Sequence, residues 1–191
     1  MLFEKIDLEN GVKQEGKSED VFLVESERTG SACNNISCKS DLSKYIIGFE
    51  KDIDIISNGA FSMHQLVHHI ISVIAQPCNI YATTWATSET IVTSLVNMKR
   101  KGLIENCFFL FDHRVMRYRP NAYLLFEQNF NCKILSIHAK ICVIESKDIS
   151  VRIVGSGNWT RNDKVEVYNI SSNKETCNFH KAYILNELKR I

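Results

Sequence analysis

Hydrophobic positions between residues 62 and 75 recur every three or four residues, which is the spacing of one face of an α-helix. Ser62 and Gln65 stand three residues apart at the start of this stretch, as in a capping box, and Pro77 follows its end. The pattern predicts a helix over 62–75 that buries an apolar face and carries histidines on its other face.

Two short apolar runs, residues 79–85 and 104–112, flank a second helical pattern at 88–102 that ends at a glycine. Strand, helix and strand in this order predict a βαβ unit. Such a unit favours parallel pairing, because the crossover helix returns the chain to the same end of the sheet.

Further patterns complete the chain after a basic loop at 113–119. The run from Ile149 to Val154 follows a turn at 146–148 and predicts a hairpin that ends at a Gly-Ser-Gly-Asn segment. The other expected elements are a helix that begins near Pro120, strands at 132–137, 138–145 and 165–171, and a terminal helix at 174–189.

The first 54 residues are polar and rich in turn formers around one apolar run, Val-Phe-Leu-Val at 21–24. They predict a partly ordered N-terminal extension with up to two short strands. Residues 55–191 then form one α/β domain, a mixed sheet flanked by helices on both faces.

Composition agrees with an ordered domain, since 45% of the 191 residues are hydrophobic and only two are proline. No apolar run approaches the length of about 18 residues that a membrane span needs, and charges interrupt the first ten residues. We therefore expect a soluble, cytoplasmic protein without a membrane partner. The seven cysteines are an odd number without CxxC pairs, and several lie within apolar runs, which predicts reduced, buried thiols. Metal binding by Cys33 and Cys38 is the alternative for these two.

The net charge of +1 hides an asymmetry between the two parts of the chain. Residues 1–54 carry 12 acidic and 7 basic side chains, whereas residues 55–191 carry 10 acidic and 16 basic ones. The mildly basic second part permits an anionic substrate.

The stretch from His138 to Asn158 gathers groups suited to one reaction. His138 and Lys140 lie two apart on a predicted strand, so their side chains share a face, and the hairpin brings Ser156 and Asn158 level with them. An imidazole can attack a phosphodiester while ammonium, hydroxyl and amide donors hold the phosphate oxygens. Lysine supplies the cation, so no metal or cofactor is required.

The spacing of His138, Lys140, Gly155, Ser156 and Asn158 resembles the HKD motif of the phospholipase D superfamily, in particular its small single-motif nucleases. The sequence departs from that pattern where Glu145 replaces the family's aspartate and where a longer hairpin turn follows it. Asp148 is the alternative occupant if the hairpin register differs. Glu166 lies near the position of a family carboxylate that orients the histidine.

The resemblance implies a phospholipase D-like fold and a metal-independent phosphodiesterase that works through a phosphohistidine. One motif supplies one His138, whereas the reaction needs a second histidine as acid, so the resemblance implies a homodimer with the site on its twofold axis. We expect an endonuclease that acts on DNA or RNA. A phospholipid-cleaving enzyme and a catalytically silent nucleic-acid-binding module are the alternatives.

Two other signals compete with this stretch. His64 and His68 lie one helical turn apart, as in zinc proteases, but Gln65 replaces the catalytic glutamate, so a solvated helix face is the expected reading. Lys99, Arg100 and Lys101 precede a second basic group with His113 and Tyr118 interleaved, in which the candidate substrate-binding residues are Arg114, Arg117 and Arg119. Trp85 and Trp159 are expected to pack in the core.

Overall fold

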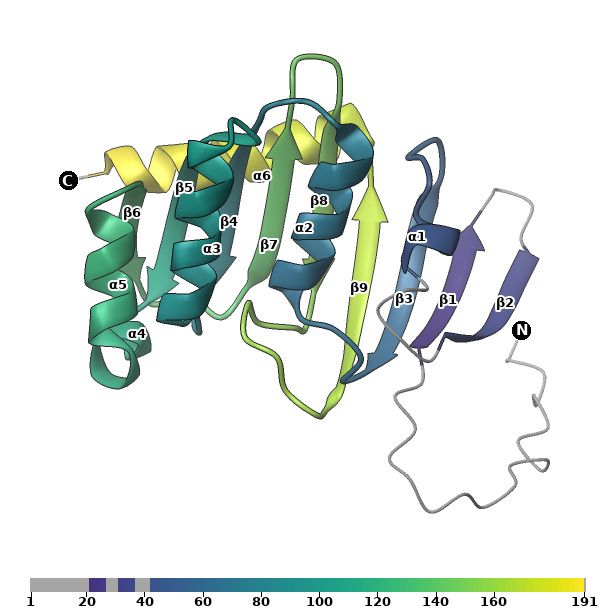
Figure 1. Cartoon of the computed structure of the whole chain (residues 1–191), viewed down its shortest axis with the longest axis horizontal. Helices are drawn as coiled ribbons and strands as arrows, with labels where there is room; N and C mark the ends of the chain where they lie inside the picture. The colour runs from purple at the N-terminus through teal and green to yellow at the C-terminus, as the bar shows by residue number, and fades with distance from the viewer. Residues whose placement is uncertain (1–20, 27–30, 37–41, 191) are drawn as a thin grey trace.

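The structure, a computed structural model, describes residues 21–26, 31–36 and 42–190. Its centre is a nine-stranded mixed sheet in the order β2-β1-β3-β9-β8-β7-β4-β5-β6 (Figure 1). The strands are β1 (Val21–Ser26), β2 (Ser31–Ile36), β3 (Asp52–Asn58), β4 (Cys78–Thr84), β5 (Ile104–Asp112), β6 (Asn131–Leu135), β7 (Lys140–Glu145), β8 (Ser150–Gly155) and β9 (Val165–Ser171).

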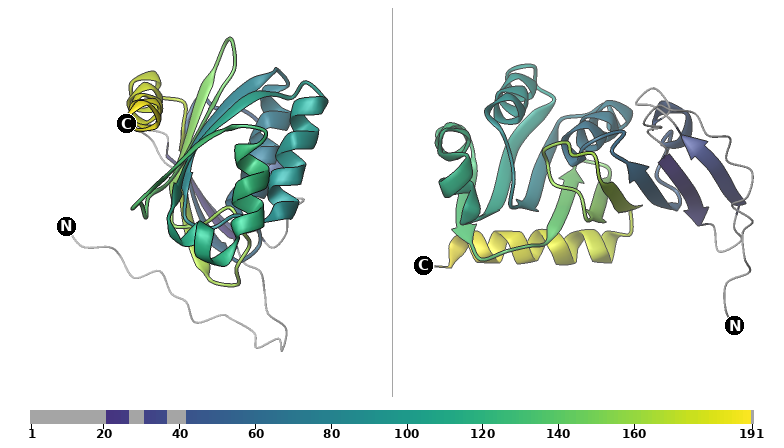
Figure 2. Two further views of the ribbon diagram at one scale, coloured as in Figure 1. Left: turned by 90° about the vertical axis from the view of Figure 1, so that its left-hand side faces the viewer. Right: turned by 90° about the horizontal axis from the view of Figure 1, so that it is seen from below.

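Helices cover both faces of the sheet, as predicted. The single helix α6 lies across one face, and the other helices lie on the opposite face (Figures 1 and 2). The helices are α1 (Leu42–Tyr45), α2 (Met63–Ile74), α3 (Glu89–Arg100), α4 (Arg114–Tyr118), α5 (Pro120–Glu127) and α6 (Lys174–Lys189). None of the described helices is both long enough and apolar enough to span a membrane.

Helix α2 forms where the spacing of hydrophobic residues predicts a helix, and it begins with the predicted capping box. Ser62 accepts a hydrogen bond from the Gln65 amide and Gln65 accepts one from the Ser62 amide, which satisfies two otherwise unpaired donors. The apolar face of α2 is buried against the sheet in the larger core, and a smaller core lies beneath α6. The five cysteines whose side chains are described are free, and all but Cys132 are buried.

The predicted βαβ unit is confirmed, because β4 and β5 pair in parallel across α3. Three expectations need correction. The segment after Asp112 forms α4 rather than a loop, and β7 begins at Lys140 instead of at residue 138. The expected domain boundary falls inside β3, whose buried Ile53 and Ile55 join the larger core, so the sheet runs on through β1 and β2.

The sheet has one edge at which the ends of many strands meet, the lower edge in Figure 1. The pairs Thr83 with Ile141, Lys140 with Gly155, and Asn58 with Val165 lie in register across it. Strands β3, β4, β5, β6 and β8 therefore end there, while β7 and β9 begin there. Loops at such an edge are free to carry chemistry on a rigid scaffold.

Candidate functional site

Lys140 opens β7 at this edge and is buried, with 6% of its surface exposed. Its Nζ donates to the His138 carbonyl at 2.8 Å and lies 3.1 and 3.3 Å from the two ring nitrogens of His138. Burial lowers the pKa of the Lys140 ammonium from its ordinary value, because water no longer solvates the charge. The carboxylate of Glu166 acts in the opposite direction.

His138 lies just before β7 and is exposed to solvent. The alternation of side chains along a strand therefore does not explain its contact with Lys140. The contact arises because the ammonium reaches back to both the carbonyl and the ring of His138. The structure thus brings together the two residues that carry the motif.

The Gly-Ser-Gly-Asn segment closes against β9 with no room for side chains at its glycines. A Cβ atom on Gly155 would lie 2.2 Å from the Val167 carbonyl oxygen, and one on Gly157 would lie 2.1 Å from the Tyr168 hydroxyl. Both glycines are needed because another backbone or ring approaches them closely. This packing fixes the loop directly beside Lys140, which pairs with Gly155.

Asn158 ties the loop to two neighbouring elements. Its carbonyl accepts from the Met63 amide at 3.3 Å, so the loop meets the first turn of α2. Its side-chain oxygen lies 3.5 Å from the Thr84 hydroxyl at the end of β4. Asn158 is half-buried, and the segment that follows Thr84 carries Trp85, the residue whose ring faces His138.

Ser156 and Glu166 form a separate pair at the same edge. The Ser156 hydroxyl donates to Glu166 and accepts from the Val167 amide at 3.0 Å. The second Glu166 oxygen accepts from Asn162 at 2.5 Å. Among the described residues the side chain of Glu166 is hydrogen-bonded to Ser156 and Asn162, and it makes no hydrogen bond to His138, contrary to expectation.

Asp112 and Arg114 extend the site toward α4. One Asp112 oxygen accepts from the Arg114 Nε at 2.6 Å and from its amide at 3.0 Å, and the other accepts from the Ile137 amide at 3.2 Å. The Arg114 hydrogen bond lowers the pKa of the buried Asp112 to about 2. One carboxylate therefore fixes both Arg114 and the segment that leads into His138.

Trp85 fills the space between these groups. The Arg114 guanidinium lies 4.2 Å from its ring centroid, the Lys140 ammonium 5.9 Å, and the His138 ring 6.1 Å. A cation over an aromatic face is attracted by the ring's quadrupole. Trp85 is only half-buried and serves the site, whereas Trp159 is fully buried in the core as expected.

Sequence reasoning missed Trp85 and Asp112 as site residues. Each stands at the carboxyl end of a strand of the predicted βαβ unit, and parallel neighbours end at the same edge. The signal for Asp112 in the sequence is its position at the end of an apolar run, because a charged side chain is rarely buried there without a partner.

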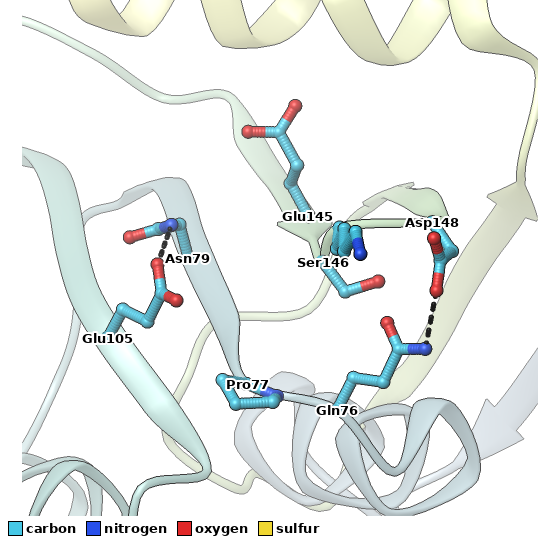
Figure 3. Close-up of a pocket in the computed structure, with 8 residues that line it drawn as sticks. Gln76, Pro77, Asn79, Glu105, Glu145, Ser146 and Asp148 are labelled. Carbon is cyan, nitrogen blue, oxygen red and sulfur yellow. Dashed lines mark hydrogen bonds between the residues drawn. The ribbon is translucent and has the colours of Figure 1, made fainter.

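Glu145 is not brought to this group, which corrects its place among the candidate catalytic residues. It ends β7, at the opposite edge of the sheet from Lys140, and binds Lys181 of α6 at 2.6 Å. Five residues of extended strand separate the two side chains by about 17 Å. Asp148 lies in the hairpin turn at that far edge and accepts from Gln76 at 2.7 Å (Figure 3).

An open pocket of about 590 Å³ lies at this far edge, and Figure 3 shows Glu145, Asp148 and Glu105 around it. It lies apart from His138. Within the described residues, no group of three or more histidine, cysteine or acidic side chains is placed to hold a metal. His64 instead contacts Ser94 at 3.2 Å, and His68 is exposed. Cys38 and the Cys33 side chain lie outside what the structure describes.

Arg117 and Arg119 are exposed on and just after α4. The Arg117 guanidinium lies 5.3 Å from the centroid of the Tyr118 ring. Of the three arginines, Arg114 is the one whose guanidinium lies over the Trp85 ring. They border the site from the side of α4.

Comparisons with known proteins give a distant likeness. No protein-family model and no curated protein matches the chain. Among solved structures, the crystal structure of polyphosphate kinase from Porphyromonas gingivalis aligns with 95% of this chain at 12% identity and a TM-score of 0.43. The chain spans about half the length of that kinase, of which 51% is covered. The phospholipase D resemblance therefore rests on the motif.

The close packing of Tyr168 on Gly157 predicts that a side chain at position 157 destabilises the protein, and that removal of the Tyr168 hydroxyl reduces this loss. Gly157→Ala forces a Cβ against the Tyr168 ring and should lower stability by about 1–3 kcal/mol. In a Tyr168→Phe background the nearest clashing atom is gone, so the same substitution should cost less. Denaturant unfolding of the four proteins tests this, and additive effects of the two substitutions would contradict the packing.

The Asp112 carboxylate predicts a pH-dependent contribution to stability. Its pKa is lowered in the folded state to about 2 from an unfolded value near 4, so its stabilisation is present above pH ~4 and is lost as pH falls toward 2. Asp112→Asn should therefore destabilise the protein by about 2 kcal/mol at neutral pH. The difference from wild type should shrink between pH 4 and 2. Unfolding curves across this range measure it, and a gap that does not change with pH would contradict the pairing with Arg114.

Proposed function

We propose that this protein is a metal-independent phosphodiesterase, most simply an endonuclease, that works through a phosphohistidine. The observation that carries the proposal is the buried Lys140 ammonium in contact with His138, beside the tightly packed loop that holds Ser156 and Asn158. A buried cation next to an exposed imidazole is suited to hold a phosphate against a nucleophile.

In the first step the His138 imidazole attacks phosphorus, and the bond from phosphorus to the leaving oxygen breaks. Lys140 and Asn158 hold the non-bridging oxygens, with Ser156 helping to position them and Glu166 holding the Ser156 hydroxyl. Arg114, fixed by Asp112, adds a second cation at the same edge. These donors stabilise the charge that grows on the phosphate in the transition state.

The leaving oxygen takes a proton from a second histidine, which we assign to His138 of the partner subunit in a homodimer. In the second step that neutral imidazole removes a proton from water, and the hydroxide displaces the first His138 from phosphorus. Both histidines return to their starting states. Exposure of His138 at the sheet edge leaves it accessible to a partner across a twofold axis.

A nucleic acid fits the charge of this surface better than a lipid does. The segment from His113 to Arg119 holds three arginines and no acidic residue, and it borders His138 through Trp85. Vesicle binding without oligonucleotide cleavage would favour the phospholipid alternative.

Cleavage in excess chelator is the first test of this chemistry. Labelled DNA and RNA, single- and double-stranded, should be cut by the wild type between about pH 5 and 8, where a histidine can serve as both base and acid. The substitution His138→Ala should lower the cleavage rate about a thousandfold or more, because it removes the nucleophile. His68→Ala is the matched control, since His68 is exposed on α2 and lies outside the site.

Substrate bound without turnover, and bound equally by His138→Ala, would instead indicate the silent binding module. Cleavage that disappears in chelator and returns with a divalent ion would overturn the metal-independent mechanism.

A mixing experiment tests the shared site. Wild type and His138→Ala, unfolded together in equal amounts and refolded, pair at random, so about one quarter of the dimers are wild type on both sides. A site that needs both histidines should retain about a quarter of the activity of an all-wild-type sample. A mixture with His68→Ala should retain full activity.

Retention of about half the activity would overturn the shared site, because each chain would then act alone. His113 would become the second histidine in that case, since its Nδ1 lies 3.9 Å from Asp112, the residue that also holds the segment before His138.

A further inference from the structure

The surface of α4 carries aromatic and apolar side chains among its arginines, although charges alone would suffice to bind a phosphate. Tyr118 is 58% exposed and Met116 is 42% exposed, on a helix that directly follows the site strand β5. Large exposed apolar side chains beside a site are more informative than scattered ones. They indicate a ligand that has an apolar face as well as negative charge.

Tyr118 lies about one helical turn from Arg114, which belongs to the site. Arg114 is the first residue of α4 and Tyr118 the last, so about 6 Å of helix axis separates them. Arg114 is fixed by Asp112 against Trp85, and Trp85 faces His138. A chain whose phosphate sits at His138 and Arg114 therefore reaches Tyr118 with its neighbouring units.

We propose that the substrate is a single-stranded nucleic acid, and that Tyr118 stacks on one of its bases next to the cleaved phosphodiester. This inference rests on the proposed phosphodiesterase function and names its substrate class. Bases of a duplex are stacked on one another and paired, so they offer no face to Tyr118, whereas every base of a single strand does. The three arginines at 114, 117 and 119 track the phosphates on either side.

The openness of the site agrees with a polymer. His138 and Ser156 are exposed, and the pockets of Figure 3 and of the α2–α3 surface are lined by other residues. A single strand bound at His138 can continue along α4 past Arg114 to Tyr118. The Arg117 guanidinium, 5.3 Å from the Tyr118 ring, adds a cation to the stacking surface.

The test compares Tyr118→Ala, Tyr118→Phe and Tyr183→Ala with the wild type. Tyr183 is the matched control, because it is also a tyrosine, 40% exposed, on α6. For a single-stranded oligothymidine, Tyr118→Ala should raise KM about tenfold with little change in kcat, whereas Tyr118→Phe keeps the ring and should behave as wild type. The Tyr183 variant should also behave as wild type.

Two further substrates separate this inference from the chemistry itself. An abasic strand of the same length has the phosphodiesters without the bases, so Tyr118→Ala should leave its cleavage unchanged while His138→Ala abolishes it. The annealed duplex should be cut more slowly than the single strand. Equal KM values for wild type and Tyr118→Ala on oligothymidine, or a preference for duplex, would overturn the single-strand inference and leave the phosphohistidine mechanism standing.

Binding measurements keep the inference testable if no substrate is cut. Fluorescence anisotropy with the same oligothymidine should show about tenfold weaker binding for Tyr118→Ala. Binding to vesicles of anionic phospholipid without binding to the oligonucleotide would refute it.

Discussion

The buried ammonium of Lys140 is the constraint around which the rest of the site is arranged. A cation removed from water needs polar partners, and here they are the carbonyl and ring of His138. Among the described residues no carboxylate forms an ion pair with it; Glu166 is bound to Ser156 and Asn162, and Asp112 to Arg114. The positive charge is therefore available to an anion, and a phosphate beside it would replace the lost hydration.

The fold supplies this arrangement at the ends of its strands. Pairing of Lys140 with Gly155 sets the loop beside the ammonium, and the close approach of Tyr168 leaves no room for a side chain at Gly157. The Asn158 carbonyl then anchors the loop to the start of α2. Small glycines and a large buried tyrosine together provide the rigidity that a site of few groups needs.

Much of this arrangement follows from local sequence pattern. Two apolar runs on either side of a polar turn predict the hairpin of β7 and β8, and the structure gives the register in which Lys140 pairs with Gly155. The capping box of α2 and the βαβ unit are likewise local signals. The motif does not give the distance between Glu145 and Lys140. Glu145 lies five residues after Lys140 in an extended strand and is therefore at the opposite edge of the sheet.

Trp85 and Asp112 depend on long-range pairing and could not be placed from local pattern. Each becomes part of the site only because β4 and β5 end side by side, next to the start of β7. Arg114 could not be singled out from the sequence either, because there it is one of several arginines. Its stacking on Trp85 and its bond to Asp112 separate it from Arg117 and Arg119.

The contrast between buried Lys140 and exposed His138 bears on how the reaction would be protected from water. An exposed imidazole acts in a high dielectric, where charge stabilisation is weak, and it has no second histidine bonded to it within the described chain. Covering this edge with a second subunit would lower the dielectric around the phosphate and bring the second imidazole at the same time. Assembly and completion of the site would then be one event.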